Sequence, residues 1–136
     1  LDTYIQEQTD LATRDGGIWT VWGLWRALPN INATGWQNYL REGAIRQAVN
    51  TPVQSLAGML TVDAYNRLGV KGLWAILNIH DQLIFIIHRD HLVQACHDIK
   101  FEMERTDVLP FECTVPIKVD ISIGKTWDSL QEVEVD

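Results

Sequence analysis

The chain has 136 residues, which is room for one domain with a hydrophobic core and too little for two. Its 46% hydrophobic and 21% charged residues are ordinary for a globular protein, and no apolar run reaches the roughly 20 residues that a membrane-spanning helix needs. The formal net charge of −7 argues against bulk electrostatic attraction to nucleic acid, so a DNA-binding role requires a local basic or polar face.

The first third of the sequence predicts a helix, a strand and a loop. Apolar residues recur at helical spacing over residues 2–14, and Gly16-Gly17 follows as a C-cap or turn. Residues 18–22, IWTVW, are rich in strand formers, whereas residues 23–35 contain proline, asparagine and glycine typical of a loop. Four of the six tryptophans lie here, and such clusters are more typical of a core or an interface than of base stacking; they are Trp19, Trp22, Trp25 and Trp36.

Two further helices are predicted along the rest of the chain. Apolar residues at mixed spacings of three and four predict a helix over residues 37–68. Pro52 removes one backbone donor inside it, so we expect the helix to kink or restart near residues 50–51. Residues 90–105 predict a second amphipathic helix with Asp90 as its N-cap.

The remaining apolar segments predict strands. LWAILNI (73–79) and LIFII (83–87) are short apolar runs on either side of turn residues, which is typical of a β-hairpin. Residues 115–124, VPIKVDISIG, alternate as a last strand does. We therefore predict an α+β fold, with an antiparallel sheet around a central β-hairpin backed by helices on one face, in a single domain over residues 1–136.

The tip of the predicted hairpin carries Asp81 between His80 and Gln82. A carboxylate at a hairpin tip is held by two strands while its oxygens stay open to ions, which suits a ligand of Mg²⁺. The alternative is that Asp81 is there because aspartate favours turns, and that His80 is an ordinary turn or core histidine.

Arg46, Asn50 and Gln54 are four residues apart, so on a helix they form one polar stripe. A guanidinium and two amides are donors suited to phosphate oxygens and to the acceptors that every base pair presents in the minor groove. The alternative is a solvated helix face.

Taken together, these stretches resemble the C-terminal palm region of family A DNA polymerases, the bacterial DNA polymerase I type with its phage and organellar relatives. The family pattern is an Arg, then Asn-x-Pro-x-Gln on a long helix, then His-Asp-Glu at a hairpin tip, then a Val-Pro strand leading to Gly-x-x-Trp. The order and spacing hold over roughly residues 15–130. The matching stretches are GIWTVWGLWRALPNIN, REGAIRQAVNTPVQSLAGML, ILNIHDQLIFII and VPIKVDISIGKTWDSL.

The resemblance implies a role for each matching residue. Asp81 matches a catalytic aspartate that binds two Mg²⁺ ions during nucleotidyl transfer from dNTP to the primer 3′-hydroxyl. His80 matches a histidine that lies against the primer terminus. Asn50 and Gln54 match amides that bind the minor groove near the new base pair, and Arg46 matches an arginine directed toward the template.

The sequence also departs from the family pattern. Gln82 stands where the family usually has Glu, and Arg26 is the one retained member of an upstream triple arginine that contacts DNA. Nothing resembles the first metal-binding motif or the nucleotide-binding helix, so we expect an incomplete palm portion that is inactive as this chain alone. Three other aspartates lie on predicted helices or in the last strand, and we do not expect them to supply the missing ligand; they are Asp63, Asp98 and Asp120.

We therefore predict template-directed DNA synthesis with a primer-template, dNTP and the remaining polymerase portion, present in the same longer chain or as a separate subunit. The alternatives are a non-catalytic palm-like module that binds primer-template or a replication partner, and an unrelated α+β domain. The first residue is not Met, which suggests processing or a longer chain, and LDTYIQEQTD lacks the regions of a signal peptide. Cys96 and Cys113 fit neither a zinc site nor a disulfide framework, so we expect reduced thiols in a bacterial or phage-infected cytoplasm or in an organelle, without membrane association.

Overall fold

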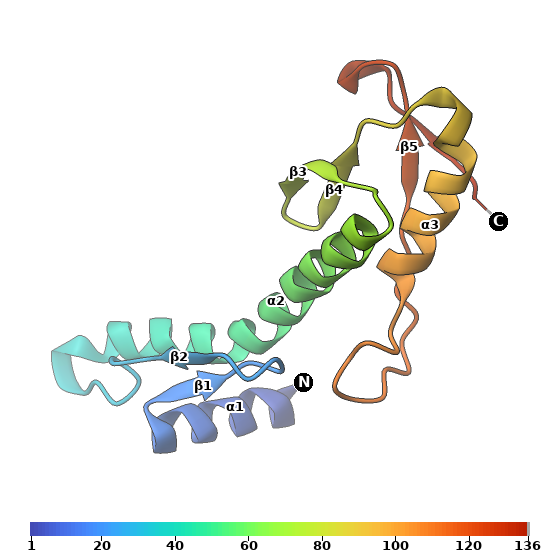
Figure 1. The fold of residues 1–136 in the computed structure, drawn as a ribbon. Helices are drawn as coiled ribbons and strands as arrows, with labels where there is room; N and C mark the ends of the chain where they lie inside the picture. Colours follow the sequence, from blue (N-terminus) through green and yellow to red (C-terminus); the bar gives the residue numbers. More distant parts are fainter. Residues whose placement is uncertain (136) are drawn as a thin grey trace. The chain divides into compact units, whose positions relative to one another are not determined.

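The computed structural model describes residues 1–135, and its contacts divide the chain into a first unit, Leu1–Met59, and a second unit, Leu60–Asp136. Helix α2 (Asn38–Val70) begins in the first unit and ends in the second (Figure 1). Each unit is described by itself below.

In the first unit, helix α1 (Asp2–Asp15) is followed by a hairpin of β1 (Gly17–Trp19) and β2 (Trp25–Ala27). Gly16 ends α1 in the left-handed conformation, with φ of 76°, and its N–H donates to the carbonyl oxygen of Ala12, as the sequence predicts. Strand β2 lies inside the segment predicted as a loop, so that prediction is wrong there. Antiparallel pairing with β1 satisfies the backbone of a segment whose own residues carry little strand preference.

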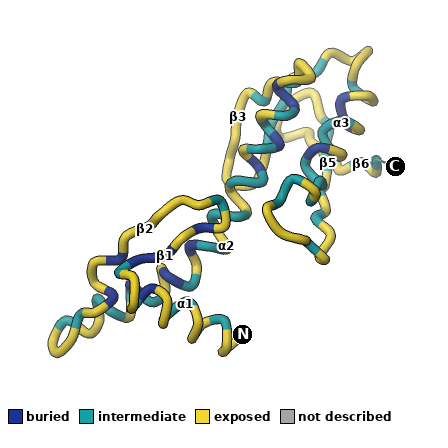
Figure 2. Tube along the Cα trace, turned by 60° about the horizontal axis from the view of Figure 1, so that its bottom comes forward, coloured by how far each residue is buried: buried dark blue, intermediate teal, exposed yellow. Residues whose placement is uncertain are grey.

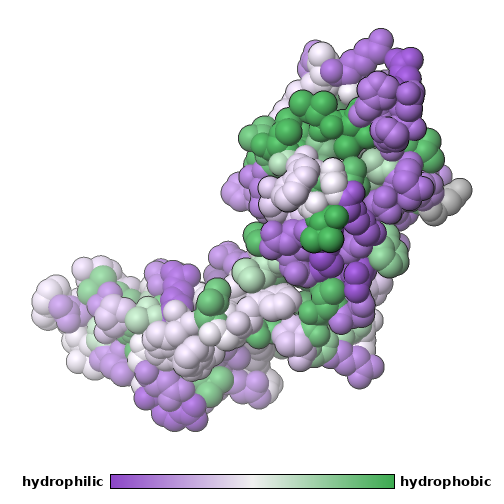
Figure 3. Space-filling view, in the orientation of Figure 1, coloured by the Kyte–Doolittle hydropathy of each residue, from purple (hydrophilic) through white to green (hydrophobic). Residues whose placement is uncertain are grey.

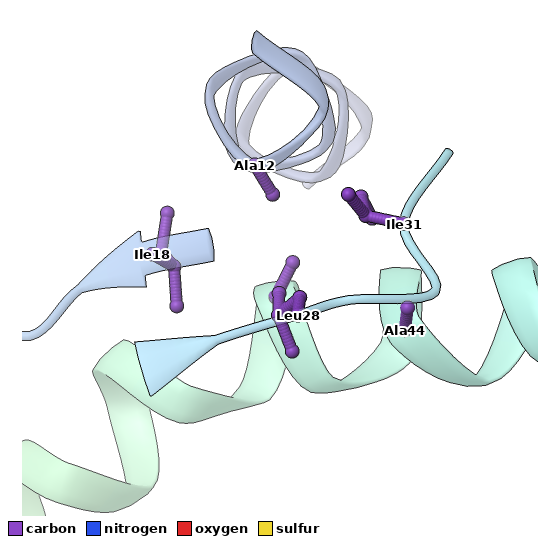
Figure 4. Packing of buried hydrophobic residues seen from close by; sticks show 6 residues of the cluster. Ala12, Ile18, Leu28, Ile31 and Ala44 are labelled. Atoms are coloured by element: carbon purple, nitrogen blue, oxygen red, sulfur yellow. The ribbon is translucent and has the colours of Figure 1, made fainter. Parts of the chain in front are cut away.

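The core of the first unit is apolar and is shared by α1, the hairpin, the following loop and α2 (Figure 4). Its largest fully buried side chains are Leu28 and Ile31; the other members are Ala12, Ile18, Ala44 and Ala48. Three tryptophans predicted for a core or an interface lie outside it, with exposures of 60%, 42% and 82% for Trp19, Trp25 and Trp36. The core assignment is wrong for these three, and the interface remains a prediction.

Helix α2 continues through Pro52, so the predicted restart near residues 50–51 does not occur, whereas the kink remains a prediction. The Thr51 hydroxyl donates to the carbonyl oxygen of Gln47 at 2.6 Å and accepts from Arg26 Nη1 at 3.0 Å. These contacts connect the helix backbone just before the proline to strand β2.

The second unit contains the predicted hairpin, formed by β3 (Ala75–Ile79) and β4 (Gln82–Phe85). Helix α3 (Leu92–Glu104) follows a 3₁₀ turn, Arg89–His91. The predicted N-cap at Asp90 is wrong, because Asp90 lies inside this turn and donates its backbone N–H to the ring of His88 before it.

The last strands of the second unit are β5 (Ile121–Ile123) and β6 (Gln131–Val133), which pair antiparallel. Strand β5 is shorter than predicted, and β6 was not predicted. Short 3₁₀ turns complete the chain at Gly35–Gln37 and Trp127–Ser129.

Helices and antiparallel strands confirm the predicted α+β class. Within residues 1–135 the strands form three two-stranded ladders, β1-β2, β3-β4 and β5-β6. The single palm domain remains a prediction. No helix among these residues is both long and apolar enough to cross a membrane.

Exposed residues occur along both units (Figure 2), and many large hydrophobic residues of both units are among them. Figure 3 shows hydrophobic side chains gathered on the second unit beside hydrophilic ones. In the hairpin Ile76 and Leu77 are exposed, and Ile86 just after it is 79% exposed.

Candidate active-site surfaces

The hairpin tip is a two-residue turn. Ile79 pairs with Gln82, which leaves His80 and Asp81 as the two connecting residues. His80 has a φ of 57°, the left-handed region that the first position of such a turn requires and that residues other than glycine rarely adopt. These residues lie at the tip as predicted. Their backbone conformation was not predicted, although the two-residue spacing between the paired strands would have indicated it.

The turn presents its polar groups to solvent, since His80, Asp81 and Gln82 are all exposed. The Asp81 carboxylate is therefore accessible from outside the hairpin, and its oxygens are the type of ligand that Mg²⁺ prefers. Among residues 1–135, no group of three histidine, cysteine, aspartate or glutamate side chains is arranged to hold a metal ion. The chemistry of the exposed Asp81 carboxylate fits a single Mg²⁺ ligand at this tip.

The predicted polar stripe lies in the first unit on α2. Arg46, Asn50 and Gln54 are exposed on this helix, while Ala44 and Ala48 are buried in the core. The spacing of four residues places the three polar side chains on one face of the helix, as predicted. Within residues 1–135 none of the three side chains makes a hydrogen bond or an ion pair, so their donors are available to a ligand.

Arg26 is connected to α2 beside this stripe. From β2 it donates to the Thr51 hydroxyl at 3.0 Å and to the Gln47 side-chain oxygen at 3.3 Å. The side chain remains exposed, and a guanidinium has five N–H donors, so these two bonds leave donors for another acceptor. No local pattern could have predicted this contact, because it joins residues 25 positions apart.

A buried carboxylate in the second unit was missed by the sequence analysis. Glu102 on α3 is 3% exposed and accepts from Arg67 Nε at 2.7 Å, from Lys71 Nζ at 2.8 Å and from Arg105 Nη1 at 3.3 Å. Burial by itself would raise the pKa of Glu102, but hydrogen bonds from Lys71 and Arg67 outweigh it and lower the pKa to about 2. Ala95, Ile99 and Glu102 have the spacing of residues on one core-facing side of a helix. This spacing could have indicated from the sequence that Glu102 is buried.

Two of the aspartates that we did not expect to bind metal belong to the same ion-pair cluster. Asp63 pairs with Arg67, and an Asp98 oxygen lies 3.6 Å from Lys71 Nζ. Asp120 is exposed and lines a small cavity of about 360 Å³ with residues of β5 and β6.

The larger cavity, of about 510 Å³, lies in the first unit between α1, β1 and α2. Its lining is mainly apolar and includes Pro52, Val53 and Leu56. None of the predicted site residues lines this cavity, and all of them are exposed.

A family model of DNA polymerase family A matches residues 1–129. The chain belongs to DNA polymerase family A. The predicted resemblance to this family is thereby confirmed.

Three relatives show how the family A chain compares with longer polymerases. It is 31% identical over 133 residues to the thermostable DNA polymerase I of Thermus thermophilus, covering 95% of the chain and 15% of that protein. It is also 31% identical to the DNA polymerase I of Pseudomonas aeruginosa, over 92% of the chain and 14% of the relative. DNA polymerase theta of Drosophila melanogaster is 28% identical, over 97% of the chain and 7% of the relative.

A solved structure is similar to most of the family A chain. It is the POL domain of Pol1 from M. smegmatis in complex with DNA primer-template and dNTP, with a TM-score of 0.77 and 26% identity. The match covers 93% of the chain and 22% of that domain. The chain therefore spans about a fifth of the solved polymerase and about one seventh of the two bacterial relatives.

Proposed function

We propose that this chain is the C-terminal palm portion of a family A DNA polymerase and takes part in template-directed DNA synthesis. The observation that carries the proposal is the exposed Asp81 carboxylate at the tip of a two-residue turn, in a chain whose family match runs over residues 1–129. The substrates are dNTP and the primer 3′-hydroxyl of a primer-template.

Asp81 supplies one carboxylate of the magnesium site, and the remaining polymerase portion supplies the second. Mg²⁺, when bound, lowers the pKa of the primer 3′-hydroxyl and neutralises charge on the leaving pyrophosphate. Asp81 holds one side of that site, while His80 lies against the primer terminus and orients it. Gln82 adds no charge there, because its amide is neutral.

The stripe on α2 reads the shape of the new base pair. Asn50 and Gln54 donate to N3 of purines and O2 of pyrimidines, acceptors that all base pairs share. Their free, exposed amides suit this role because they sense pair geometry without sequence preference. Arg46 contacts the template strand, and Arg26 uses the donors not bonded to α2 for a backbone phosphate.

The proposed partners are primer-template DNA, dNTP and the remaining polymerase portion, which lies in the same longer chain or in a separate subunit. The solved relative contains DNA primer-template and dNTP. Exposed apolar residues on the hairpin, such as Ile76 and Leu77, favour a protein partner for the second unit. The setting is a bacterial or phage-infected cell, or an organelle.

A second candidate is a non-catalytic palm-like module that binds primer-template or a replication partner. It is favoured by Gln82 in place of the family's usual Glu and by the lack of a three-residue acidic or histidine cluster within residues 1–135. This module would keep the stripe on α2 and need no metal at Asp81.

A chimeric polymerase separates the two candidates. In it, this chain replaces the matching segment of the Thermus thermophilus relative, and the unmodified relative is the control. We expect the chimera to bind primer-template and to extend it with Mg²⁺, and removal of Mg²⁺ by a chelator to stop extension. A chimera that binds primer-template as tightly as the control and fails to extend it would support the non-catalytic module.

A further inference from the structure

The β3–β4 hairpin leaves α2 through a tightly closed turn. The N–H of Leu73 donates to the carbonyl oxygen of Leu68 at 2.9 Å, and that of Gly72 donates to Gly69 at 3.0 Å. This pair of bonds is a Schellman motif, and Gly72 takes the left-handed conformation that the motif needs, with φ of 82°. Only two residues then separate Gly72 from the first residue of β3, so the direction of the hairpin is set close to the helix end.

Trp74 is the residue immediately before β3, and its indole lies on the last turns of α2. A methyl group added at Gly69 would approach the ring atoms of Trp74 to 2.8 and 3.0 Å, closer than real side-chain contacts allow. The indole also meets Tyr65 edge-on, with ring centroids 6.4 Å apart and planes at 71°. Gly69 therefore leaves room for a ring that contacts the helix at two successive turns.

The same ring is 63% exposed, so burial of Trp74 does not by itself explain its placement. Contacts with α2 at Gly69 and Tyr65 restrict the orientation of the Trp74 ring. They thereby also restrict the orientation of the backbone that directly follows Trp74. The strand begins at Ala75 and ends at Ile79, next to the turn that carries Asp81. The ring contact therefore lies one residue before the start of a strand that leads directly to the turn with Asp81.

We propose that Trp74 and Gly69 are positioning residues, whose contact fixes the direction of the hairpin on α2 and so places the Asp81 carboxylate. The effect of this placement on catalysis rests on the proposed polymerase function. The orientation of the hairpin by the Trp74–Gly69 contact, the mechanical part of the proposal, does not depend on that function. Neither residue touches the reacting groups.

The mechanical part is tested by NMR residual dipolar couplings on the 136-residue chain. Gly69→Ala forces the indole off the helix, so the couplings of the hairpin amides, residues 75–85, should no longer fit the wild-type orientation relative to residues 60–68. Gly58→Ala is the matched control, because it lies in the same helix and an added methyl group there meets nothing within 4 Å. Unchanged hairpin couplings in Gly69→Ala, or equal changes in Gly58→Ala, would overturn the proposal.

Trp74→Ala removes the same contact without introducing a steric clash. It therefore provides the test of the contact if Gly69→Ala does not fold. Without the ring, the hairpin should sample several orientations, and averaging over them should reduce its residual dipolar couplings. The couplings of residues 60–68 should stay as in wild type. The double variant Gly69→Ala/Trp74→Ala should match Trp74→Ala, because the added methyl group has no ring to displace. Full-sized hairpin couplings in Trp74→Ala would overturn the proposal.

The functional part is measured in the chimeric polymerase. Gly69→Ala should lower kcat by about 10- to 100-fold, as expected for misplacing a reacting group by about 1 Å, with the Kd for primer-template unchanged. Gly58→Ala should leave kcat within twofold. If Asp81→Asn leaves the chimera active, the proposed function fails but the coupling result stands; if Asp81→Asn inactivates it and Gly69→Ala changes neither kcat nor couplings, the positioning role fails.

Discussion

The two units of the chain bury different chemistry. The first unit encloses an apolar cluster in which Leu28 and Ile31 are almost fully buried, whereas the second unit encloses the Glu102 carboxylate with Arg67, Lys71 and Arg105 around it. Apolar packing changes little with pH, while a buried carboxylate contributes according to its ionisation. The unit that carries the proposed metal ligand thus combines buried apolar residues such as Leu68 with a buried carboxylate whose contribution depends on its charge.

The largest expected change in stability comes from removing the buried charge. Glu102→Gln leaves the cations around it without their carboxylate and should lower the free energy of unfolding by about 3–5 kcal/mol. Urea unfolding measures the change, and hydrogen exchange should place the lost protection in α3 and the end of α2. The control is Glu112→Gln at an exposed position, with an expected effect below about 0.5 kcal/mol; an equally small effect of Glu102→Gln would contradict the comparison.

A mutation that creates a cavity in the core of the first unit should lower the free energy of unfolding slightly less. Leu28 is 1% exposed, so Leu28→Ala should destabilise by about 3 kcal/mol through lost burial and the cavity that remains. Leu24→Ala, at a residue that is 56% exposed in the same hairpin, should cost less than about 1 kcal/mol. Protection from hydrogen exchange should fall in β1 and β2; a loss confined to α3 would show that the two interiors are not independent.

The pH dependence of the free energy of unfolding tests the same difference between the two units. The pKa of Glu102 is about 2 in the folded chain against an ordinary value of 4.5, so its contribution is fully present above pH 4.5 and is lost as pH falls through 2. Between pH 6 and pH 3 the wild type should lose about 2 kcal/mol more than Glu102→Gln, since only the wild type binds this proton on unfolding. Leu28→Ala should follow the wild-type profile, and identical profiles for wild type and Glu102→Gln would refute the role of this carboxylate.

The smallest expected effect concerns the turn at the hairpin tip. His80 has a φ of 57°, so His80→Gly should relieve backbone strain and raise the free energy of unfolding by about 0.5–1 kcal/mol. Asp81→Gly, at a neighbour without a positive φ, should lower it by a similar amount because glycine adds entropy to the unfolded chain. Thermal unfolding measures both variants, and destabilisation by His80→Gly would show that the turn is not strained.

The features predicted from the sequence are those that depend on neighbouring residues. The helical spacing before Gly16 predicted α1 and its C-cap, and two apolar runs around a polar turn predicted the β3–β4 hairpin. The spacing of Arg46, Asn50 and Gln54 predicted their common exposed face.

The features that were missed depend on residues far apart in the chain. Strand β2 forms because β1 pairs with it, and the contact of Arg26 with Thr51 joins residues 25 positions apart. Two partners of Glu102, Arg67 at the end of α2 and Lys71 just after it, are far from it in the sequence, and Arg67 is 35 positions away. No local pattern encodes these contacts, because they depend on tertiary packing.

The central claim is that Asp81 binds the catalytic metal. It is tested most directly by the single-turnover rate of nucleotide incorporation in the chimeric polymerase, with Asp81→Asn compared with Asp120→Asn, another exposed aspartate of the second unit. The proposal predicts a fall of about 10³-fold or more for Asp81→Asn, because the neutral amide no longer holds the metal, and a change within threefold for Asp120→Asn. A rate for Asp81→Asn within threefold of wild type would contradict it.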